Sequence, residues 1–314
     1  MVAIVLGIIR FIPRTAGLRL MRILGFILYY LMPERRRVAM TNLAIAFGTD
    51  MSASRRDAIA RASFQNFMAL LFDFLKVPQM DPAARERIVT IEGRDHLEEA
   101  LSKGRGVLAV SAHYGNFLLL LCALGLEGYP LHVVTRHFRS ERLEAVYTAI
   151  LARFGVLTFP RRHEAANILK ALKHGAIVGY VLDQNMRAEN GIFVEFFGRQ
   201  ASTIKGLATL AGRYGSPILP AHILSSPDGS HRIHIGRALF PEDSKAMKAR
   251  EQELTQHYTS MIEGWIRHCP EQWLWAHRRF KTRPAGEPPI YPPRGAFKTV
   301  LKRRRRNRRA LRGA

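Results

Sequence analysis

The middle of the chain alternates short apolar segments with helical periods, and this alternation constrains the fold more than any other feature. Apolar runs occur at residues 106–112, 131–135, 156–159, 176–182 and 217–223. Amphipathic periods occur between or after them, at residues 143–154, 164–173 and 203–214. Because the runs are apolar throughout, we expect strands that are buried on both faces of the sheet. The pattern predicts an α/β fold with a mixed or parallel sheet flanked by helices.

A longer helical period precedes these segments. Apolar residues recur at helical spacing over residues 59–75, and Pro78 then stops the helix. Ser54 and Asp57 lie ahead of this period at the spacing of a capping box. Since neither a repeat nor a linker divides the chain after its N-terminal region, we expect one domain over residues 33–297.

The positive charge of the chain is concentrated at its two ends. The 48 Lys and Arg residues outnumber the 25 Asp and Glu residues, which gives a formal charge of +23. Residues 298–314 carry nine of these basic residues and no acidic one, and residues 1–37 carry seven against the single acid Glu34, which leaves +8 for residues 38–297. An acidic partner is therefore expected. The hydrophobic content of 47% excludes a wholly disordered or purely basic tail protein.

Residues 298–314 are predicted to be a disordered basic tail. Counterion release would favour binding to either anionic lipid or nucleic acid. The tail has no interleaved aromatic residue on which bases could stack, so nucleic acid is the less favoured partner. A second contact with the membrane surface, or a free end, is the preferred interpretation.

Residues 1–32 have the composition of a membrane-associated helix. Their two apolar runs, 2–9 and 23–32, are each shorter than the ~20 residues that span a bilayer. At 100° per residue, about half of the helix circumference carries arginine, at Arg10, Arg14, Arg19 and Arg22. This predicts a helix in the membrane interface with its arginines toward anionic headgroups. A tilted span and a buried helix of the globular core are the alternatives.

Several kinds of site are not expected. Cys122 and Cys269 lie far apart and outside any metal-binding spacing, which argues against a disulfide and a cysteine zinc site. The sequence also lacks the motifs G-x-x-x-x-G-K-[ST], H-E-x-x-H and G-x-S-x-G. We therefore expect neither a metal nor a cofactor.

The best candidate for chemistry follows the strand predicted at residues 106–112. His113 stands at the carboxyl end of that strand, before Gly115, Asn116 and a further apolar run. This is where α/β folds place reactive groups, and an imidazole there can act as a general base near neutral pH. Asn116 could shape the pocket or donate to a developing oxyanion. The segment alone is equally compatible with a structural histidine that caps the next helix.

Further polar residues follow the strand predicted at residues 176–182. Asp183 and Gln184 emerge directly after it, where they would neighbour the His113 loop. Later in the chain, Arg199 precedes Ser202 and Thr203, either of which could cap a helix and form an anion site with the arginine. Together these residues predict a pocket for an anionic substrate that bears a hydroxyl.

Six segments resemble the lipid A late acyltransferase family, the lauroyl and myristoyl transferases of the wider lysophospholipid acyltransferase group. They are RRRVAMTNLAIAF (35–47), SAHYGNF (111–117), VVTRHF (133–138), DQN (183–185), FFGRQAST (196–203) and PEQWLWAHRRFKTRP (270–284). The last string is long and rich in tryptophan, so a chance match is improbable. The resemblance covers nearly all of residues 1–293 and excludes the basic tail.

The resemblance implies a fold, a location and a reaction. The fold is a single acyltransferase domain, held by its N-terminal helix at the cytoplasmic face of the bacterial inner membrane. The reaction moves a fatty acyl chain from acyl carrier protein, or acyl-CoA, to a hydroxyl of a lipid A precursor or related anionic glycolipid. An acyltransferase acting on a lysophospholipid or an aminolipid is the alternative.

The resemblance also implies roles for individual residues. His113 matches the histidine of the family's H-x-x-x-x-[DE] motif, which is the base. Arg136 and Arg199 would hold phosphates or sugar oxygens of the acceptor, with Asp183 and Gln184 nearby. Arg136 is equally compatible with a solvated arginine at a strand end.

Leu118 departs from the family motif, because it stands where the motif has a carboxylate. An imidazole without an orienting carboxylate loses control of its tautomer and stabilisation of its charged form. There are three interpretations: Asp183 orients His113 across the cleft, the histidine works alone, or the chain has lost acyl transfer and only binds membranes. We favour an active enzyme, because the other motif positions are intact.

The tryptophan-rich string adds two expectations. Trp273 and Trp275 are expected to be core residues or membrane-interface anchors rather than catalytic residues. Arg278, Arg279 and Lys281 could bind headgroups or form a basic surface for an acidic carrier protein.

Overall fold

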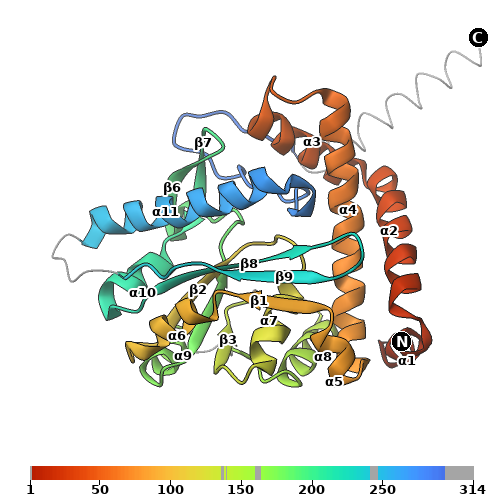
Figure 1. Cartoon of the computed structure of the whole chain (residues 1–314). Helices are drawn as coiled ribbons and strands as arrows, with labels where there is room; N and C mark the ends of the chain where they lie inside the picture. The colour runs from red at the N-terminus through yellow and green to blue at the C-terminus, as the bar shows by residue number, and fades with distance from the viewer. Residues whose placement is uncertain (1, 136–137, 139, 160–163, 241–246, 294–314) are drawn as a thin grey trace, which may run out of the picture.

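A seven-stranded mixed sheet forms the centre of the molecule (Figure 1). The computed structural model describes residues 2–135, 138, 140–159, 164–240 and 247–293. The strand order is β1-β9-β8-β2-β5-β3-β4, with β1 (Val89–Glu92), β2 (Val107–Ser111), β3 (Leu131–Val133), β4 (Leu157–Thr158), β5 (Ile177–Val181), β8 (Ile218–Ser225) and β9 (His231–Ile235). Strands β8 and β9 pair antiparallel, and the other neighbours pair in parallel. The predicted α/β fold with a mixed sheet is confirmed.

Helices precede, connect and cover the strands (Figure 1). They are α1 (Val2–Phe11), α2 (Arg14–Leu31), α3 (Pro33–Phe47), α4 (Ala53–Lys76), α5 (Pro82–Glu86), α6 (Arg94–Ser102), α7 (Phe117–Leu126), α8 (Glu141–Ala152), α9 (Glu164–Lys173), α10 (Gly206–Tyr214) and α11 (Met247–His268). Three short 3-10 helices are η1 (Val77–Gln79), η2 (Ala188–Asn190) and η3 (Pro270–Gln272).

Both faces of the central strands are buried, which explains their unbroken apolar runs. Val107 packs with the apolar residues of α7 and α8, whereas Leu108 packs with those of α11. Successive side chains of a strand point to opposite faces, so each neighbour enters a different core cluster. The five predicted strands are present, although each is shorter or shifted by a few residues.

A hairpin of β6 (Gly191–Phe196) and β7 (Arg199–Ile204) replaces part of a predicted helix. Phe197 and Gly198 both have positive φ angles, of 51° and 68°, as a two-residue hairpin turn requires. Ser202 and Thr203 therefore lie in β7 and do not cap a helix, which begins only at Gly206. The predicted helix-cap anion site beside Arg199 is wrong.

The N-terminal region forms two helices instead of the single predicted one. The chain breaks at Pro13, and α2 then lies beside α4 (Figure 1). The two helices approach closely at glycines: a Cβ atom on Gly25 would lie 2.6 Å from the carbonyl oxygen of Phe64. Among the described helices, none is long and apolar enough to cross a bilayer alone. The pair α2 and α3, bent by 92°, meets the length and composition requirement together.

The predicted orientation of the N-terminal arginines is wrong in part. Arg14 turns inward, and its Nε lies 2.7 Å from Oδ1 of the buried Asp73. The outward surface of α2 instead exposes apolar side chains, such as Leu20 (57%) and Ile23 (57%). One face of α2 is thus packed against the domain, as in the buried-helix alternative, while the opposite face is apolar and open.

The start of α4 differs from the predicted capping box. Ser52 is the N-cap residue, and its Oγ accepts a hydrogen bond from the backbone N–H of Arg55 at 3.2 Å. Asp57 lies inside the helix and accepts hydrogen bonds from Tyr29 and Arg36. The helix therefore begins one residue before Ser54, and Asp57 binds the neighbouring helices.

Candidate active site

The parallel pairing of β2 and β5 brings His113 and Asp183 together. Ser111 and Val181 end these strands and are partners in the sheet register. Each candidate residue comes two positions later, so both emerge at the same edge of the sheet. His113 Nδ1 lies 2.8 Å from Asp183 Oδ1, and the backbone N–H of His113 donates to the same oxygen at 3.1 Å.

Asp183 is a buried carboxylate with donors on both oxygens. Its side chain is 3% exposed, and Trp273 Nε1–H donates to Oδ2 at 2.7 Å. Burial acts to raise the pKa of the carboxyl, but the charge of His113 and the hydrogen bonds from His113 and Trp273 outweigh it. The net pKa of Asp183 lies well below its usual range. Asp183 is therefore ionised at neutral pH and accepts a hydrogen bond from Nδ1–H of His113.

This contact determines which nitrogen of His113 can act as a base. A proton held on Nδ1 leaves the lone pair on Nε2. The imidazole is 20% exposed, and the ring of Phe117 packs edge-on with its centroid 4.8 Å away. The amide nitrogen of Gln184 lies 3.0 Å from Nε2 and 3.4 Å from Nδ1. Because the Gln184 nitrogen lies at similar distances from both ring nitrogens, it packs against the face of the imidazole and not in line with the Nε2 lone pair.

Leu118 belongs to the apolar core and not to this hydrogen-bonded group. It is 7% exposed on α7 and packs in the cluster that lies between that helix and the sheet. The carboxylate that contacts His113 comes from the adjacent strand end instead. Of the three interpretations of the Leu118 departure, the geometry supports the one in which Asp183 orients His113.

Asn116 has a structural position at the start of α7. Its Oδ1 accepts from the backbone N–H of Leu119 at 3.2 Å, and its Nδ2 donates to Asp73 Oδ2 at 3.3 Å. The residue is 2% exposed. The cap of α7 is thus Asn116, and the suggestion that His113 caps that helix is wrong. Both ends of the Asn116 amide have protein partners, so its role toward a substrate stays a prediction.

The structure describes only one of the two arginines predicted to hold the acceptor. Arg199 is exposed at the start of β7 in the hairpin. Arg136 lies outside the described residues. Their roles toward a substrate therefore stay predictions. Within the described ranges, no group of three or more His, Cys, Asp or Glu side chains could hold a metal ion.

One C-terminal segment, residues 270–284, fastens both loops of the site. Besides the Trp273 contact with Asp183, the backbone N–H of Leu274 donates to the carbonyl of His113 at 3.2 Å. The backbone N–H of Gly115 donates to the carbonyl of Gln272 at 3.0 Å. Trp273 and Trp275 are 1% and 0% exposed, so they are core residues and not membrane-interface anchors.

The same segment holds the loop that follows β5. Nε2 of His277 accepts from the backbone N–H of Asn185 at 3.1 Å. Burial lowers the pKa of His277 to about 4, which keeps this imidazole neutral and able to accept. The side chain of Asn185 in turn accepts from the backbone N–H of Thr282 at 2.8 Å. These hydrogen bonds fix the loop that follows Asp183 and so help to hold its side chain in position.

Arg279 corrects an expectation about the basic string. It is 0% exposed, so it cannot bind a headgroup or a carrier protein at the surface. Its Nη1 donates to the carbonyl of Ser202 at 2.7 Å, its Nη2 donates to Thr203 Oγ1, and its guanidinium lies 5.1 Å from the ring centroid of Phe196. Burial lowers the pKa of Arg279 to about 10, so it remains charged at neutral pH.

Sequence reasoning missed the hydrogen-bonding role of residues 270–284 in the site. A signal for it was present, because a buried tryptophan requires an acceptor for its indole N–H. That signal does not say which acceptor is used. The contact between Trp273 and Asp183 joins residues 90 positions apart, and such a pairing depends on the path of the whole chain.

The chain is similar to known proteins of lipid A biosynthesis. A family model described as "Bacterial lipid A biosynthesis acyltransferase" matches residues 1–282. The lipid A biosynthesis palmitoleoyltransferase of Escherichia coli K12 is 29% identical over 263 residues, which is 82% of each chain. The lauroyltransferase of the same organism is 27% identical over 85% of this chain and 86% of its own. The corresponding myristoyltransferase is 22% identical over 80% and 77%.

Proposed function

The chain belongs to the bacterial lipid A biosynthesis acyltransferase family and is an acyltransferase, and from this premise we propose that it acylates a hydroxyl of a lipid A precursor. The donor is a fatty acyl thioester of acyl carrier protein or CoA. The observation that carries the proposal is the 2.8 Å contact between His113 Nδ1 and the buried carboxylate of Asp183. It supplies the orienting carboxylate that the motif position at Leu118 lacks.

The proposed reaction begins at Nε2 of His113. This nitrogen takes the proton of the acceptor hydroxyl as the oxygen attacks the thioester carbonyl. The C–O bond forms, and the carbonyl becomes a tetrahedral oxyanion. Collapse of this intermediate breaks the C–S bond, and the imidazolium returns its proton to the leaving thiolate. The products are an ester and a free thiol.

Asp183 contributes by orienting and stabilising the imidazole. Its ionised carboxylate accepts a hydrogen bond from Nδ1–H and stabilises the imidazolium that forms during the reaction. The depressed pKa of Asp183 keeps the carboxylate charged throughout this cycle. In this proposal the neighbouring Gln184, whose amide contacts the imidazole, binds an oxygen of the acceptor. Arg199 and Arg136 retain their proposed roles toward acceptor phosphates.

We also propose that the exposed face of α2 contacts the cytoplasmic face of the inner membrane. Apolar side chains recur there at helical spacing: Leu20 (57% exposed), Ile23 (57%), Ile27 (45%) and Leu31 (69%). Such a stripe is typical of a helix whose apolar side enters the headgroup and acyl boundary. Flotation with anionic vesicles tests this contact. Replacement of Ile23 and Ile27 by Ser should weaken flotation, whereas the distant exposed Leu157→Ser should not. Equal flotation of all three proteins would contradict it.

The test of the reaction uses the purified full chain in detergent. The chain is incubated with acyl carrier protein or CoA thioesters and with three separate acceptors: a lipid A precursor, a lysophospholipid and an aminolipid. Mass spectrometry should detect an added acyl chain on the lipid A precursor. Transfer only to another lipid would favour the alternative acceptor class. The absence of transfer to every acceptor would support a membrane-binding protein that has lost its activity.

A further inference from the structure

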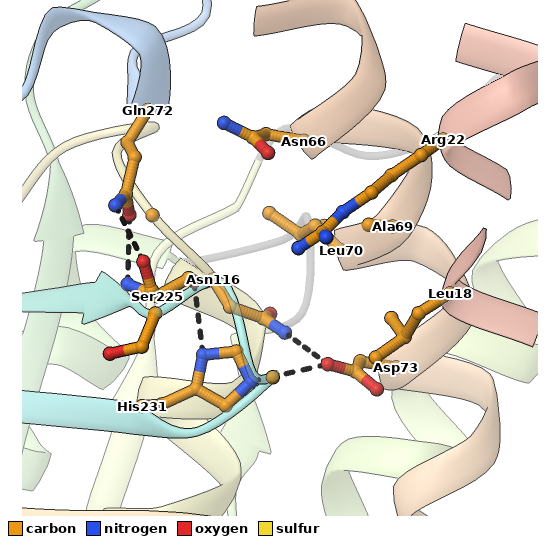
Figure 2. A pocket seen from close by; sticks show the side chains of 13 residues that line it. Leu18, Arg22, Asn66, Ala69, Leu70, Asp73, Asn116, Ser225, His231 and Gln272 are labelled. Atoms are coloured by element: carbon orange, nitrogen blue, oxygen red, sulfur yellow. Dashed lines mark hydrogen bonds and ion pairs between the residues drawn. The ribbon is translucent and has the colours of Figure 1, made fainter. Parts of the chain in front are cut away.

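A pocket lies beside the His113 loop, between α2, α4 and the turn that joins β8 to β9 (Figure 2). Its lining includes Arg22, Asn66, Asn116, Ser226 and Gln272. Its cavity has a volume of about 30 Å³. A buried water requires roughly 10–15 Å³ on the same scale, so two or three waters or one small tetrahedral oxyanion would fit.

Asp73 also lines this pocket, but its charge is already compensated. Arg14 donates to both oxygens, at 2.7 and 2.8 Å. Oδ2 also contacts Asn116 Nδ2 at 3.3 Å and His231 Nε2 at 3.2 Å. The buried ion pair of Arg14 and Asp73 is therefore close to neutral as a unit. The remaining cation then determines the charge that the pocket presents to a ligand.

That cation is Arg22 of α2. Its Nε is buried and donates to no hydrogen-bond acceptor within the described part of the chain. Figure 2 shows the side chain reaching from α2 across the pocket toward Asn66 and Leu70 of α4. A buried donor without an acceptor is unfavourable. The pocket thus presents a guanidinium with an unpaired Nε beside neutral polar side chains.

We propose that this pocket binds the phosphate group of a lipid, with Arg22 as its principal ligand. The planar guanidinium donates in a fork that matches two oxygens of a phosphate. The phosphate could be the diester of an anionic phospholipid or the monoester of a phosphorylated glycolipid. The pocket alone favours a phosphate ligand. The inference that this phosphate belongs to a lipid rests on the proposed contact of α2 with the membrane. Gly115 and Asn116, two and three positions after His113, line the pocket, so an occupied site would stabilise the base of the His113 loop.

Calorimetric titration of the detergent-solubilised full chain tests the proposal. The probes are inorganic phosphate and dihexanoyl phosphatidylglycerol, kept below the concentration at which the lipid forms micelles. We expect saturable binding of at least one probe, weakened at least tenfold by Arg22→Gln. The matched control is Arg19→Gln, because Arg19 is exposed on the same helix, and it should bind like the unaltered protein. Preference for inorganic phosphate would indicate a monoester, and preference for the lipid a diester.

Two results would overturn the proposal: no saturable binding of either probe, or equal weakening by the Arg22 and Arg19 substitutions. The second would mean that surface charge alone attracts the probes. Arg22→Lys guards against a misfolded Gln variant, since it retains the charge and loses only the fork. It should weaken binding several-fold while Arg19→Lys has no effect, with thermal unfolding recorded for each protein. Ile23 and Ile27 lie outside the pocket, so the serine variant used for flotation does not test phosphate binding.

Discussion

The protein contains two His–Asp pairs that look similar in isolation and differ in their surroundings. In the first pair, His113 lies 2.8 Å from Asp183, and its side chain is 20% exposed. In the second, His231 lies 3.2 Å from Asp73, and its side chain is 4% exposed. The carboxylate of the second pair also receives two donors of the Arg14 guanidinium, as well as the Asn116 amide drawn in Figure 2.

The difference lies in what each carboxylate is free to do. Among the described residues, Asp183 receives only neutral donors besides His113, so its charge remains directed at the imidazole. Asp73 forms an ion pair with Arg14, and this contact ties α2 to α4. A His–Asp contact is therefore not by itself a sign of catalysis. Access to the imidazole and an uncompensated carboxylate distinguish the His113–Asp183 pair, which is proposed to be reactive, from the His231–Asp73 pair.

Matched Asn substitutions should separate the two pairs most strongly. Asp183→Asn should reduce turnover by roughly 10²–10⁴-fold, because the neutral amide neither fixes the tautomer nor stabilises the imidazolium. Asp73→Asn should leave turnover per folded molecule within a few-fold of normal, while lowering the free energy of unfolding by about 3–5 kcal/mol, because Arg14 loses its buried partner. Kinetics and denaturant unfolding measure the two effects. Similar kinetic losses in both variants would erase the proposed distinction.

Trp273 offers a finer test of how Asp183 is held. Trp273→Phe removes the indole donor to Oδ2 and keeps an aromatic ring, so we expect kcat to fall by about tenfold with little change in KM. The matched control is Trp275→Phe, because Trp275 is equally buried and donates to the carbonyl of Pro270 instead. An equal fall in kcat for the two variants would indicate that Trp273 contributes through packing and not through its hydrogen bond to Asp183.

Leu118→Glu tests whether the family position needs a carboxylate in this chain. Leu118 lies in an apolar cluster, so a buried carboxyl there should destabilise the fold by roughly 2 kcal/mol or more. Turnover should stay the same or fall, because Asp183 already contacts Nδ1 of His113. A large gain in turnover would show that the natural pair is impaired.

The smallest expected effect is on the pH dependence of stability. The pKa values of Asp73 and Asp183 are both lowered in the folded protein. Each carboxylate therefore contributes stability that is present above the usual aspartate pKa, near 3.8, and is lost as pH falls toward the folded value. Acid titration of the unfolding free energy should show a steeper fall for the natural protein than for Asp73→Asn. Parallel curves would contradict a linked ionisation at Asp73.

The contact between His113 and Asp183 could be predicted because it is a local consequence of strand order. Two buried strands that pair in parallel place the residues after them at one edge, so His113 and Asp183 meet once β2 and β5 are neighbours. The periodicity of residues 164–173 likewise predicted α9 with its observed bounds. These inferences needed only the repeat of a strand or a helix.

The errors arose where a side chain's partner lies far away in sequence. Arg14 was expected to face headgroups, but it pairs with Asp73, 59 positions later. Arg279 was expected at the surface, but it is buried beneath the β6–β7 hairpin, whose Phe196 ring it covers. Ser202 was expected at a helix start, because a turn of Phe197 and Gly198 was not anticipated. Charge and composition do not specify such pairings.

Single-turnover acyl transfer by His113→Ala and His231→Ala, measured side by side, tests the central claim most directly. Both variants should be purified as folded proteins and assayed with the same thioester donor and lipid A precursor at saturating concentrations. We predict that His113→Ala loses roughly 10²–10⁴-fold in rate, the usual contribution of a positioned base. His231→Ala should retain most of its rate and unfold more readily. An undiminished rate in His113→Ala, or an equal loss in both variants, would contradict the assignment of His113 as the base.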